Sequence, residues 1–286
     1  MTTAFVNGDF LPLESAAISP MDRGFLFGDG IYEVIPCREG RMMAFTRHMS
    51  RLQDGLDAIN IDNPMTTDDW HTCLEKLRRS AAADDCAIYL QVTRGPASTR
   101  NHKYPATSEP TVFAYSYSIP AASDGAPSTA TGLRVITGRD RRWQRCNIKS
   151  VSLLGNVLHL MEGVEAGVEE ILLFNDRDEL TEAAACNVFI TDGDRVITPP
   201  LDHQKLPGIT RSVLIDLMRR DGGWNIEEAI ITRQQVRRAD EVWLTSATKD
   251  IAPVIEVDNR SVGDGTPGPL WSKAQTLLYR HRFDLD

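Results

Sequence analysis

Lys149 is the first residue of this sequence to weigh as a catalytic group, because amines are scarce in it. Only six of the 31 basic residues are lysines, and the other 25 are arginines. Lys149 directly follows the apolar Ile148, and the apolar Val151 comes two residues after it, just before a predicted helix. A lysine becomes a nucleophile when desolvation or neighbouring cations lower its pKa. A surface lysine whose stem covers apolar neighbours is the plainer interpretation, and the local sequence alone favours it.

Glu182 is a second candidate, since small residues and a predicted strand follow it in the segment LTEAAACNVF. Small neighbours let a flat ligand approach the backbone closely, so the carboxylate can project into a tight cleft. The alternative is a solvated loop acid, which the motif alone does not exclude.

Two segments have the features of phosphate sites. In Leu206–Arg211, LPGITR, the free N–H groups of a predicted helix start can bind an anion, and Gly208 permits close approach. Thr245–Thr248 follows a predicted strand and offers consecutive hydroxyls and amides. Taken alone, a Pro-Gly turn and an ordinary polar turn explain both segments equally well.

The loop from Arg94 to His102 is a candidate carboxylate site. An arginine such as Arg100 can hold a carboxylate through two parallel hydrogen bonds, and His102 can add a third donor. A solvated basic loop is the alternative.

The first half of the chain has the pattern of an α+β domain, with strands, then helices, then strands. Apolar spacing predicts one helix capped by Thr46 and another opening at Thr67. The predicted strands are a hairpin over Ala4–Leu13 turning at Asn7-Gly8, a second hairpin of Ile31–Val34 and Met42–Phe45 turning at Glu39-Gly40, Ala87–Thr93, and Thr111–Ser118.

The stretch from Pro120 to Thr131, PAASDGAPSTAT, has no periodicity and predicts an interdomain linker. We therefore expect a small N-terminal domain over 1–119, a linker over 120–131 and a larger, β-rich C-terminal domain over 132–286. In the second half, the predicted strands are Leu133–Thr137, Glu170–Phe174, Asn187–Ile190 and Glu241–Thr245, and the predicted helices are Leu153–Ala166, Ile209–Arg220 and Leu270–Arg280.

The composition excludes several classes of protein. At 286 residues, with 42% hydrophobic and 25% charged residues, the chain is ordinary globular protein of about two domains. The net charge of −9 argues against broad nucleic-acid binding. No apolar run is long enough to span a membrane, and we expect no signal peptide and a cytoplasmic location. The five cysteines have neither metal-ligand spacing nor a CxxC pair, so no metal site is expected.

The order of these segments is more specific than any one of them. In chain order they are RGFLFGDGIYEV (Arg23–Val34), HMSRL (His48–Leu52), the stretch around Lys149, TEAAACNVF (Thr181–Phe189), LPGITR and TSATKDIAPV. Together they resemble the class IV (fold type IV) pyridoxal-phosphate aminotransferases, from Phe5 to about Val254. The resemblance implies a two-domain α+β fold and favours the functional interpretations above over the plainer ones.

The resemblance also implies roles for individual residues. The cofactor would be pyridoxal 5'-phosphate, with Lys149 as the Schiff-base lysine and proton shuttle and Glu182 as the partner of the pyridine nitrogen. The other cofactor-binding residues would be Arg51, the N–H groups of Ile209 and Thr210, Ala247 and the Thr248 hydroxyl at the phosphate, and Leu206 against the ring.

Within this family, RWQRCNIKS (Arg142–Ser150) and the loop RNH resemble the D-amino-acid aminotransferases. Arg100 and His102, with Tyr32, would then form the trap for the substrate carboxylate, although the loop from Arg94 to Arg100 is one residue longer than in that branch. The implied reaction moves the amino group of a D-amino acid of the D-alanine type to a 2-oxo acid such as 2-oxoglutarate. A homodimer is implied as well, with no nucleic-acid or membrane partner.

Four other functions stay open at this point. A branched-chain L-amino-acid or (R)-amine transaminase would depend little on Arg100. An aminodeoxychorismate lyase of the same fold would release pyruvate without an amino acceptor. A non-catalytic protein that kept the fold would have no need of both Lys149 and Glu182.

Overall fold

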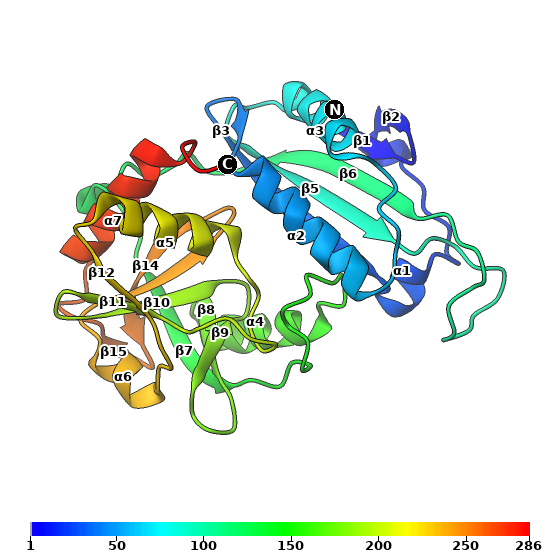
Figure 1. Cartoon of the computed structure of the whole chain (residues 1–286). Helices are drawn as coiled ribbons and strands as arrows, with labels where there is room; N and C mark the ends of the chain where they lie inside the picture. Colours follow the sequence, from blue (N-terminus) through cyan, green and yellow to red (C-terminus); the bar gives the residue numbers. More distant parts are fainter. Residues whose placement is uncertain (1) are drawn as a thin grey trace. The chain divides into compact units, whose positions relative to one another are not determined.

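The computed structural model describes residues 2–286, and the chain divides into two compact units (Figure 1). The first unit contains the chain up to Ala121, together with Ile148–Leu153 and Asp286. The second contains Ala122–Asn147 and Leu154–Leu285. The segment that carries Lys149 thus belongs to the first unit, although it lies far along the sequence.

The first unit is built on a six-stranded sheet in the order β2-β1-β6-β5-β3-β4. Asn7 and Gly8, both at positive φ, make the two-residue turn between β1 and β2, as the sequence predicts. The strands are β1 (Thr3–Val6), β2 (Asp9–Pro12), β3 (Gly30–Arg38), β4 (Arg41–Met42), β5 (Cys86–Thr93) and β6 (Thr111–Ser118).

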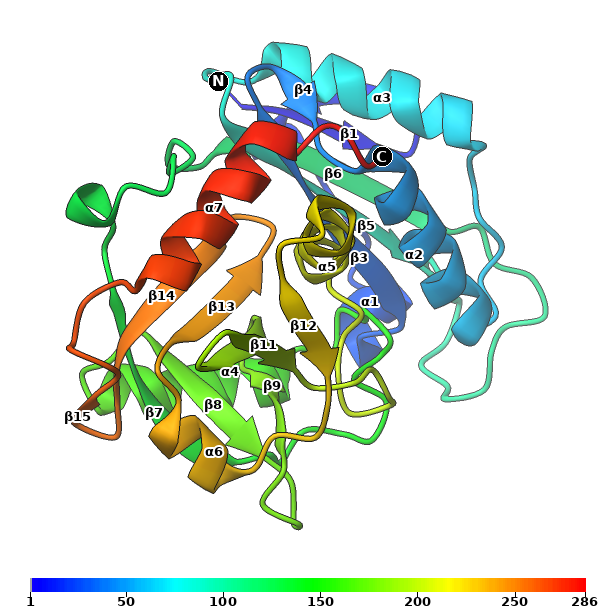
Figure 2. The ribbon, with the colours of Figure 1, turned by 60° about the vertical axis from the view of Figure 1, so that its left-hand side comes forward.

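Helices α2 (Phe45–Ala58) and α3 (Thr67–Ser80) cover one face of this sheet (Figure 2). The apolar sides of both helices join Ile31, Ile35 and Leu90 in one buried cluster. A short helix, α1 (Arg23–Phe27), precedes β3 and is capped by Asp22.

Two details of the predicted second hairpin are wrong. The strand expected to reach Phe45 stops at Met42, and Thr46 does not cap the following helix. Ala44, in a left-handed conformation at φ 48°, is the residue before α2, so Thr46 lies in the first turn. The helix begins at Phe45, one residue before the predicted cap Thr46, because the Phe45 side chain is buried in the core of the unit.

The second unit is built on a nine-stranded mixed sheet in the order β12-β11-β10-β13-β14-β7-β8-β9, with β15 paired to β14. All four strands predicted in this half are present as β7, β8, β10 and β13. The strands are β7 (Leu133–Arg139), β8 (Glu170–Phe174), β9 (Leu180–Ala183), β10 (Asn187–Asp192), β11 (Arg195–Thr198), β12 (Asn225–Glu228), β13 (Val242–Ser246), β14 (Asp250–Val257) and β15 (Arg260–Ser261).

Four α-helices accompany this sheet in the described chain: α4 (Leu154–Glu165), α5 (Ile209–Asp221), α6 (Arg233–Arg238) and α7 (Pro269–His281). Helices α5 and α7 lie side by side (Figure 2). Helix α4 packs on β7 and β8. Two short 3-10 helices, η1 (Leu13–Ser15) and η2 (Pro127–Thr129), complete the structure, the second within the predicted linker. Among residues 2–286 no helix combines the length and apolarity needed to cross a bilayer.

Candidate active site

Lys149 lies beside the first residues of β3. Its backbone carbonyl accepts a hydrogen bond from the N–H of Tyr32 at 3.0 Å, and its Nζ lies 4.0 Å from the centroid of the Tyr32 ring. Ile148 is buried in the core of the unit and Ser150 forms a β-bridge with Ile31, so the segment is fixed on both sides of the lysine. The structure therefore brings together two predicted site residues, Lys149 and Tyr32.

A buried charged cluster lies in the same unit. Glu33 accepts bonds from Arg51 Nε at 2.8 Å and from Arg51 Nη2 at 2.8 Å, and its Oε2 lies 2.7 Å from His48 Nδ1. Burial alone would raise the pKa of Glu33, but the charges and hydrogen bonds of Arg51 and His48 outweigh it and hold that pKa far below its usual range. Arg51, predicted to bind the cofactor phosphate, is therefore held by a carboxylate from β3.

His48 connects this cluster to the lysine electrostatically. Burial lowers the pKa of His48, and the positive charges of Arg51 and Lys149 lower it further. The charge and hydrogen bond of Glu33 raise it, but by less.

Arg100 and His102 both lie against Phe27 at the end of α1. The Arg100 guanidinium is 5.0 Å from the centroid of the Phe27 ring, and the His102 ring is 5.2 Å from it. Arg23 fixes the loop that carries both residues, because its Nη1 donates a hydrogen bond to the carbonyl of Asn101 at 2.5 Å. The structure thus gathers the two predicted loop residues at Phe27, while it places Tyr32 with Lys149.

The base of this loop is fixed by a buried ion-pair group. Asp29 Oδ2 lies 2.8 Å from the Nε atoms of both Arg23 and Arg94. The pKa of Asp29 is lowered because these two guanidinium groups outweigh the effect of burial. None of these three residues was a predicted site residue, although each belongs to a segment that the resemblance covers.

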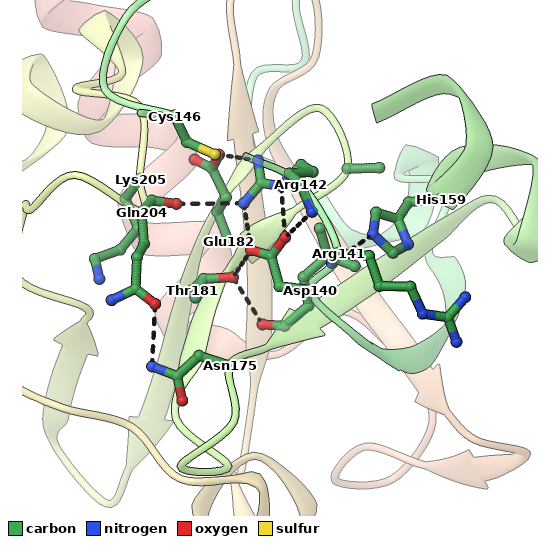
Figure 3. A network of polar contacts seen from close by, with 12 residues as sticks. Asp140, Arg141, Arg142, Cys146, His159, Asn175, Thr181, Glu182, Gln204 and Lys205 are labelled. Atoms are coloured by element: carbon green, nitrogen blue, oxygen red, sulfur yellow. Dashed lines mark hydrogen bonds and ion pairs between the residues drawn. The ribbon is translucent and has the colours of Figure 1, made fainter. Parts of the chain in front are cut away.

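In the second unit, Glu182 is buried at the end of β9 (Figure 3). Its carboxylate accepts from Arg142 Nη1, from the Leu206 N–H at 2.9 Å and from Asn187 Nδ2 at 3.2 Å. Burial raises the pKa of Glu182, and Arg142 opposes that rise. The solvated loop acid is therefore excluded for Glu182.

Arg142 is shared between two carboxylates. It donates from Nε and Nη2 to Asp140 at 3.0 and 2.7 Å, in the bidentate geometry that suits a guanidinium. Thr181 donates its hydroxyl to the same Asp140 at 2.7 Å (Figure 3). Asp140 thereby satisfies most of the charge of Arg142, and Glu182 receives a single bond from it.

The two predicted phosphate segments lie near this carboxylate in the fold of the second unit. Gly208 precedes α5 and no side chain caps the helix, which leaves the first N–H groups, including those of Ile209 and Thr210, available to a ligand. Asn187 Nδ2 donates to the carbonyl of Leu206 at 2.9 Å and so connects this segment to Glu182.

The second segment is the turn between β13 and β14, where Ala247 and Thr248 are half-buried. Asn187, the first residue of β10, pairs with Thr245 near the end of β13. The sheet register therefore places the start of this turn beside Asn187, which donates a hydrogen bond to Glu182.

Comparison with known proteins identifies the family. The model of the amino-transferase class IV family matches residues 30–257. The D-alanine aminotransferase of Bacillus licheniformis is 36% identical over 272 residues, which cover 95% of this chain and 94% of that protein. The chain belongs to the class IV aminotransferases. The D-alanine aminotransferase of Staphylococcus haemolyticus is 33% identical, with 96% of each chain covered.

Solved aminotransferase structures share this fold. A branched-chain amino acid aminotransferase of Escherichia coli matches with a TM-score of 0.89 at 22% identity, over 99% of this chain and 95% of that one. The PLP-bound form of a hypothetical aminotransferase from Mycobacterium tuberculosis matches with a TM-score of 0.84 at 20% identity, over 98% of each chain. The predicted family and the α+β fold type IV architecture are thus confirmed.

The class IV aminotransferases depend on pyridoxal 5'-phosphate, and this chain has the chemistry to hold it. It offers a primary amine in Lys149, a buried carboxylate in Glu182 for a pyridine nitrogen, and an uncapped helix start at Gly208 for a phosphate. Among the described residues no group of three His, Cys, Asp or Glu side chains is arranged to hold a metal ion.

Proposed function

We propose that this aminotransferase acts on D-amino acids of the D-alanine type and passes the amino group to a 2-oxo acid such as 2-oxoglutarate. The observation that carries the proposal is the similarity to D-alanine aminotransferases over nearly the whole chain. The solved branched-chain enzyme is similar at only 22% identity and supports the fold alone.

Lys149 is the residue that we assign to the chemistry. Bound pyridoxal phosphate supplies an electron sink for the charge that develops at the substrate Cα. The amine of Lys149 takes the proton from that Cα and later returns a proton, as general base and then general acid. Tyr32, whose ring faces the Lys149 amine, limits the directions from which a substrate can approach it.

The remaining residues hold and orient. We assign Glu182 to the pyridine nitrogen, where a buried carboxylate favours the protonated ring. We assign the phosphate to the Arg51 side chain, the N–H groups of Ile209 and Thr210, Ala247 and the Thr248 hydroxyl. We assign Leu206 to the face of the pyridine ring. We assign the substrate carboxylate to Arg100, His102 and Tyr32. The bound geometry then decides which Cα–H bond is directed at Lys149, and this sets the stereochemistry.

We also propose a cytoplasmic homodimer, with an N-terminal domain over 1–119, a linker over 120–131 and a C-terminal domain over 132–286, apart from Ile148–Leu153, which belong to the first compact unit. All five cysteines are free and buried, which suits a reducing compartment. The partners would be the amino acid and the 2-oxo acid, with no nucleic acid and no membrane surface.

The test uses the purified enzyme with bound cofactor and follows the cofactor absorbance band. We expect D-alanine to bleach the band with formation of pyruvate, and L-leucine to leave it unchanged. The Lys149→Ala variant should lose all turnover, whereas Lys273→Ala, in which a lysine that donates to the Gly223 carbonyl is removed, should keep it.

Each other outcome points to a specific error. Bleaching by L-leucine alone would replace the D-amino-acid assignment with a branched-chain one. Pyruvate release without any amino acceptor would indicate a lyase. Turnover in the Lys149→Ala variant would overturn the role of that lysine.

A further inference from the structure

Glu170 has a buried carboxyl group to which the proposed function gives no role. It is the first residue of β8 and is fully buried. Within residues 2–286 no lysine, arginine or histidine side chain lies within ion-pair distance of it. Burial raises the pKa of Glu170, and the nearby backbone N–H groups and the charge of Lys249 only partly oppose that rise. A carboxyl group is costly to keep in such surroundings, which points to a role beyond packing.

The carboxyl group of Glu170 holds the turn between β9 and β10, residues 184–186. Its Oε1 accepts a hydrogen bond from the N–H of Ala184 at 3.1 Å and another from the N–H of Ile171 at 3.0 Å. Its Oε2 lies 3.8 Å from the Sγ of Cys186, whose thiol is the donor. One carboxyl group thus contacts both the first and the last residue of the turn.

This turn lies next to the carboxylate that we assign to the pyridine nitrogen. It starts two residues after Glu182 and ends directly before Asn187, whose Nδ2 donates to Glu182 at 3.2 Å. Asn156 Nδ2 donates to the carbonyl of Ala184 at 2.7 Å, so both backbone polar groups of Ala184 have partners. A shift of the turn would therefore move Glu182 relative to Asn187.

Lys249 reaches the same turn from the second predicted phosphate segment. It directly follows Thr248 in the turn between β13 and β14, and its Nζ lies 3.9 Å from the Sγ of Cys186. Burial raises the pKa of the Cys186 thiol to about 12, so the thiol keeps its proton at neutral pH. A protonated thiol can accept from Lys249 and donate to Glu170 at the same time. The three side chains therefore connect one turn to the other.

We propose that Glu170 and Lys249 are positioning residues of the cofactor site, which hold the β9–β10 turn and the β13–β14 turn together through the thiol of Cys186. The inference rests on the proposed function, which assigns Glu182 to the pyridine nitrogen and Thr248 to the phosphate. Pyridoxal phosphate presents these two groups at a nearly fixed separation. Two turns that are already held together bind it with a smaller loss of freedom.

The experiment titrates the full-length protein, freed of cofactor, with pyridoxal phosphate and measures the dissociation constant. Lys249→Met removes the charge of an exposed residue, and we expect the dissociation constant to rise about fivefold or more, while Lys249→Arg stays close to the unaltered protein. Glu170→Gln keeps an acceptor for the Ala184 N–H but loses the attraction to Lys249, so it should give a similar rise. The double variant should bind no more weakly than either single variant, because both changes break one connection.

Two matched control variants lie outside both turns. Lys273→Met removes another exposed lysine of the second unit, whose Nζ donates to the Gly223 carbonyl at 2.9 Å. Glu241→Gln changes another buried glutamate that accepts backbone N–H groups, those of Leu270 and Trp271 at the start of α7. We expect Glu241→Gln to lower the melting temperature of the cofactor-free protein, and both controls to leave the dissociation constant within about twofold.

The possible outcomes separate this inference from the proposed function. Glu182→Gln and Thr248→Val change the assigned cofactor residues themselves, and unchanged affinity in both would overturn those assignments. Weaker binding in these two variants, but not in Lys249→Met or Glu170→Gln, would overturn the inference alone.

Two further results would also overturn the connection between the turns. Variants of Glu170 and Lys249 that lower only the melting temperature of the cofactor-free protein would show a packing role. A double variant whose loss of affinity equals the product of the two single losses would show that the residues act separately. If Glu170→Gln fails to fold, the comparison of Lys249→Met with Lys249→Arg decides, since Lys249 is exposed.

Discussion

Two buried glutamates show how neighbouring cations decide the charge on a carboxyl group. Burial pushes the pKa values of both Glu33 and Glu182 upward. Glu33 has Arg51 in two hydrogen bonds and His48 in a third, and its pKa falls. Glu182 shares Arg142 with Asp140, and its pKa stays raised. A carboxyl group of the second kind responds to a new positive partner, which is the property that a pyridinium site needs.

The lowered pKa of Glu33 predicts a specific response of stability to acid. Because the folded pKa lies below the unfolded value of about 4.3, the stabilisation is complete above that pH and is lost as pH falls toward the folded pKa. Glu33→Gln should cost about 3 kcal/mol in the free energy of unfolding at pH 7, since it leaves Arg51 without its buried anion. The cost should shrink as the pH falls below about 4.

Urea denaturation at several pH values measures this difference. Glu227→Gln is the matched control, because that glutamate pairs with Arg195 while both side chains are almost half exposed, and it should change stability by less than about 1 kcal/mol at every pH. An equal cost for Glu33→Gln at pH 3 and pH 7 would contradict the charge argument and leave only a packing effect.

The sequence indicated the candidate catalytic and cofactor-binding residues, but not the side chains that hold them in place. Lys149 and Glu182 stand within recognisable segments, and both prove to be at least half-buried. Arg142 also stands in a segment singled out for its resemblance, yet its tie to Glu182 spans 40 positions and joins a loop to a strand. A contact of that kind depends on the tertiary fold, so local pattern gives no indication of it.

The start of helix α5 depends on Gly208 having no side chain. A Cβ on Gly208 would overlap Asn187 Oδ1, and Asn187 is the residue that connects Glu182 to the Leu206 carbonyl. Gly208 is at φ −66°, so backbone freedom does not explain the glycine. Close approach of the helix start to Asn187 explains it.

Gly208→Ala should therefore weaken cofactor binding more than it weakens the fold. We expect the dissociation constant for pyridoxal phosphate to rise about tenfold or more, since overpacking costs about 1–3 kcal/mol and displaces Asn187. Titration with the cofactor measures the effect. Gly223→Ala is the matched control, because the nearest atom to its new Cβ would be 3.4 Å away. Equal affinities in the two variants would show that the helix start does not contact the cofactor.

Elements with clear apolar periodicity were predictable, and short polar strands were not. Helices α2 and α3 start within two residues of their predicted starts, and α5 and α7 lie within a residue of their predicted ranges at each end. Strands β9, β11 and β12 have only four residues each, and β12 reads NIEE, with little apolar content. β9 and β11 pair with the strands just before them, β8 and β10, whereas β12 obtains its hydrogen bonds by parallel pairing with β11.

At the scale of the whole molecule, each unit has a core of its own. One apolar cluster contains Leu90 and the cysteines Cys37, Cys73 and Cys86, and another contains Leu244 and Cys186. Leu90 and Leu244 are both fully buried. The buried thiols can therefore report which core has opened, since a thiol reacts with a reagent only when it is exposed.

This arrangement predicts that cavities in the two cores expose different thiols. Leu90→Ala should speed labelling of Cys37, Cys73 and Cys86, and Leu244→Ala should speed labelling of Cys186. A buried Leu→Ala change costs about 2–5 kcal/mol, which corresponds to an acceleration of roughly 30-fold or more when opening is reversible. Mass spectrometry of peptides after a timed maleimide pulse measures each site, and each variant is the control for the other. If both variants accelerated all four thiols equally, the two cores would open as one cooperative body, and the division of the chain into separately stabilised units would be wrong.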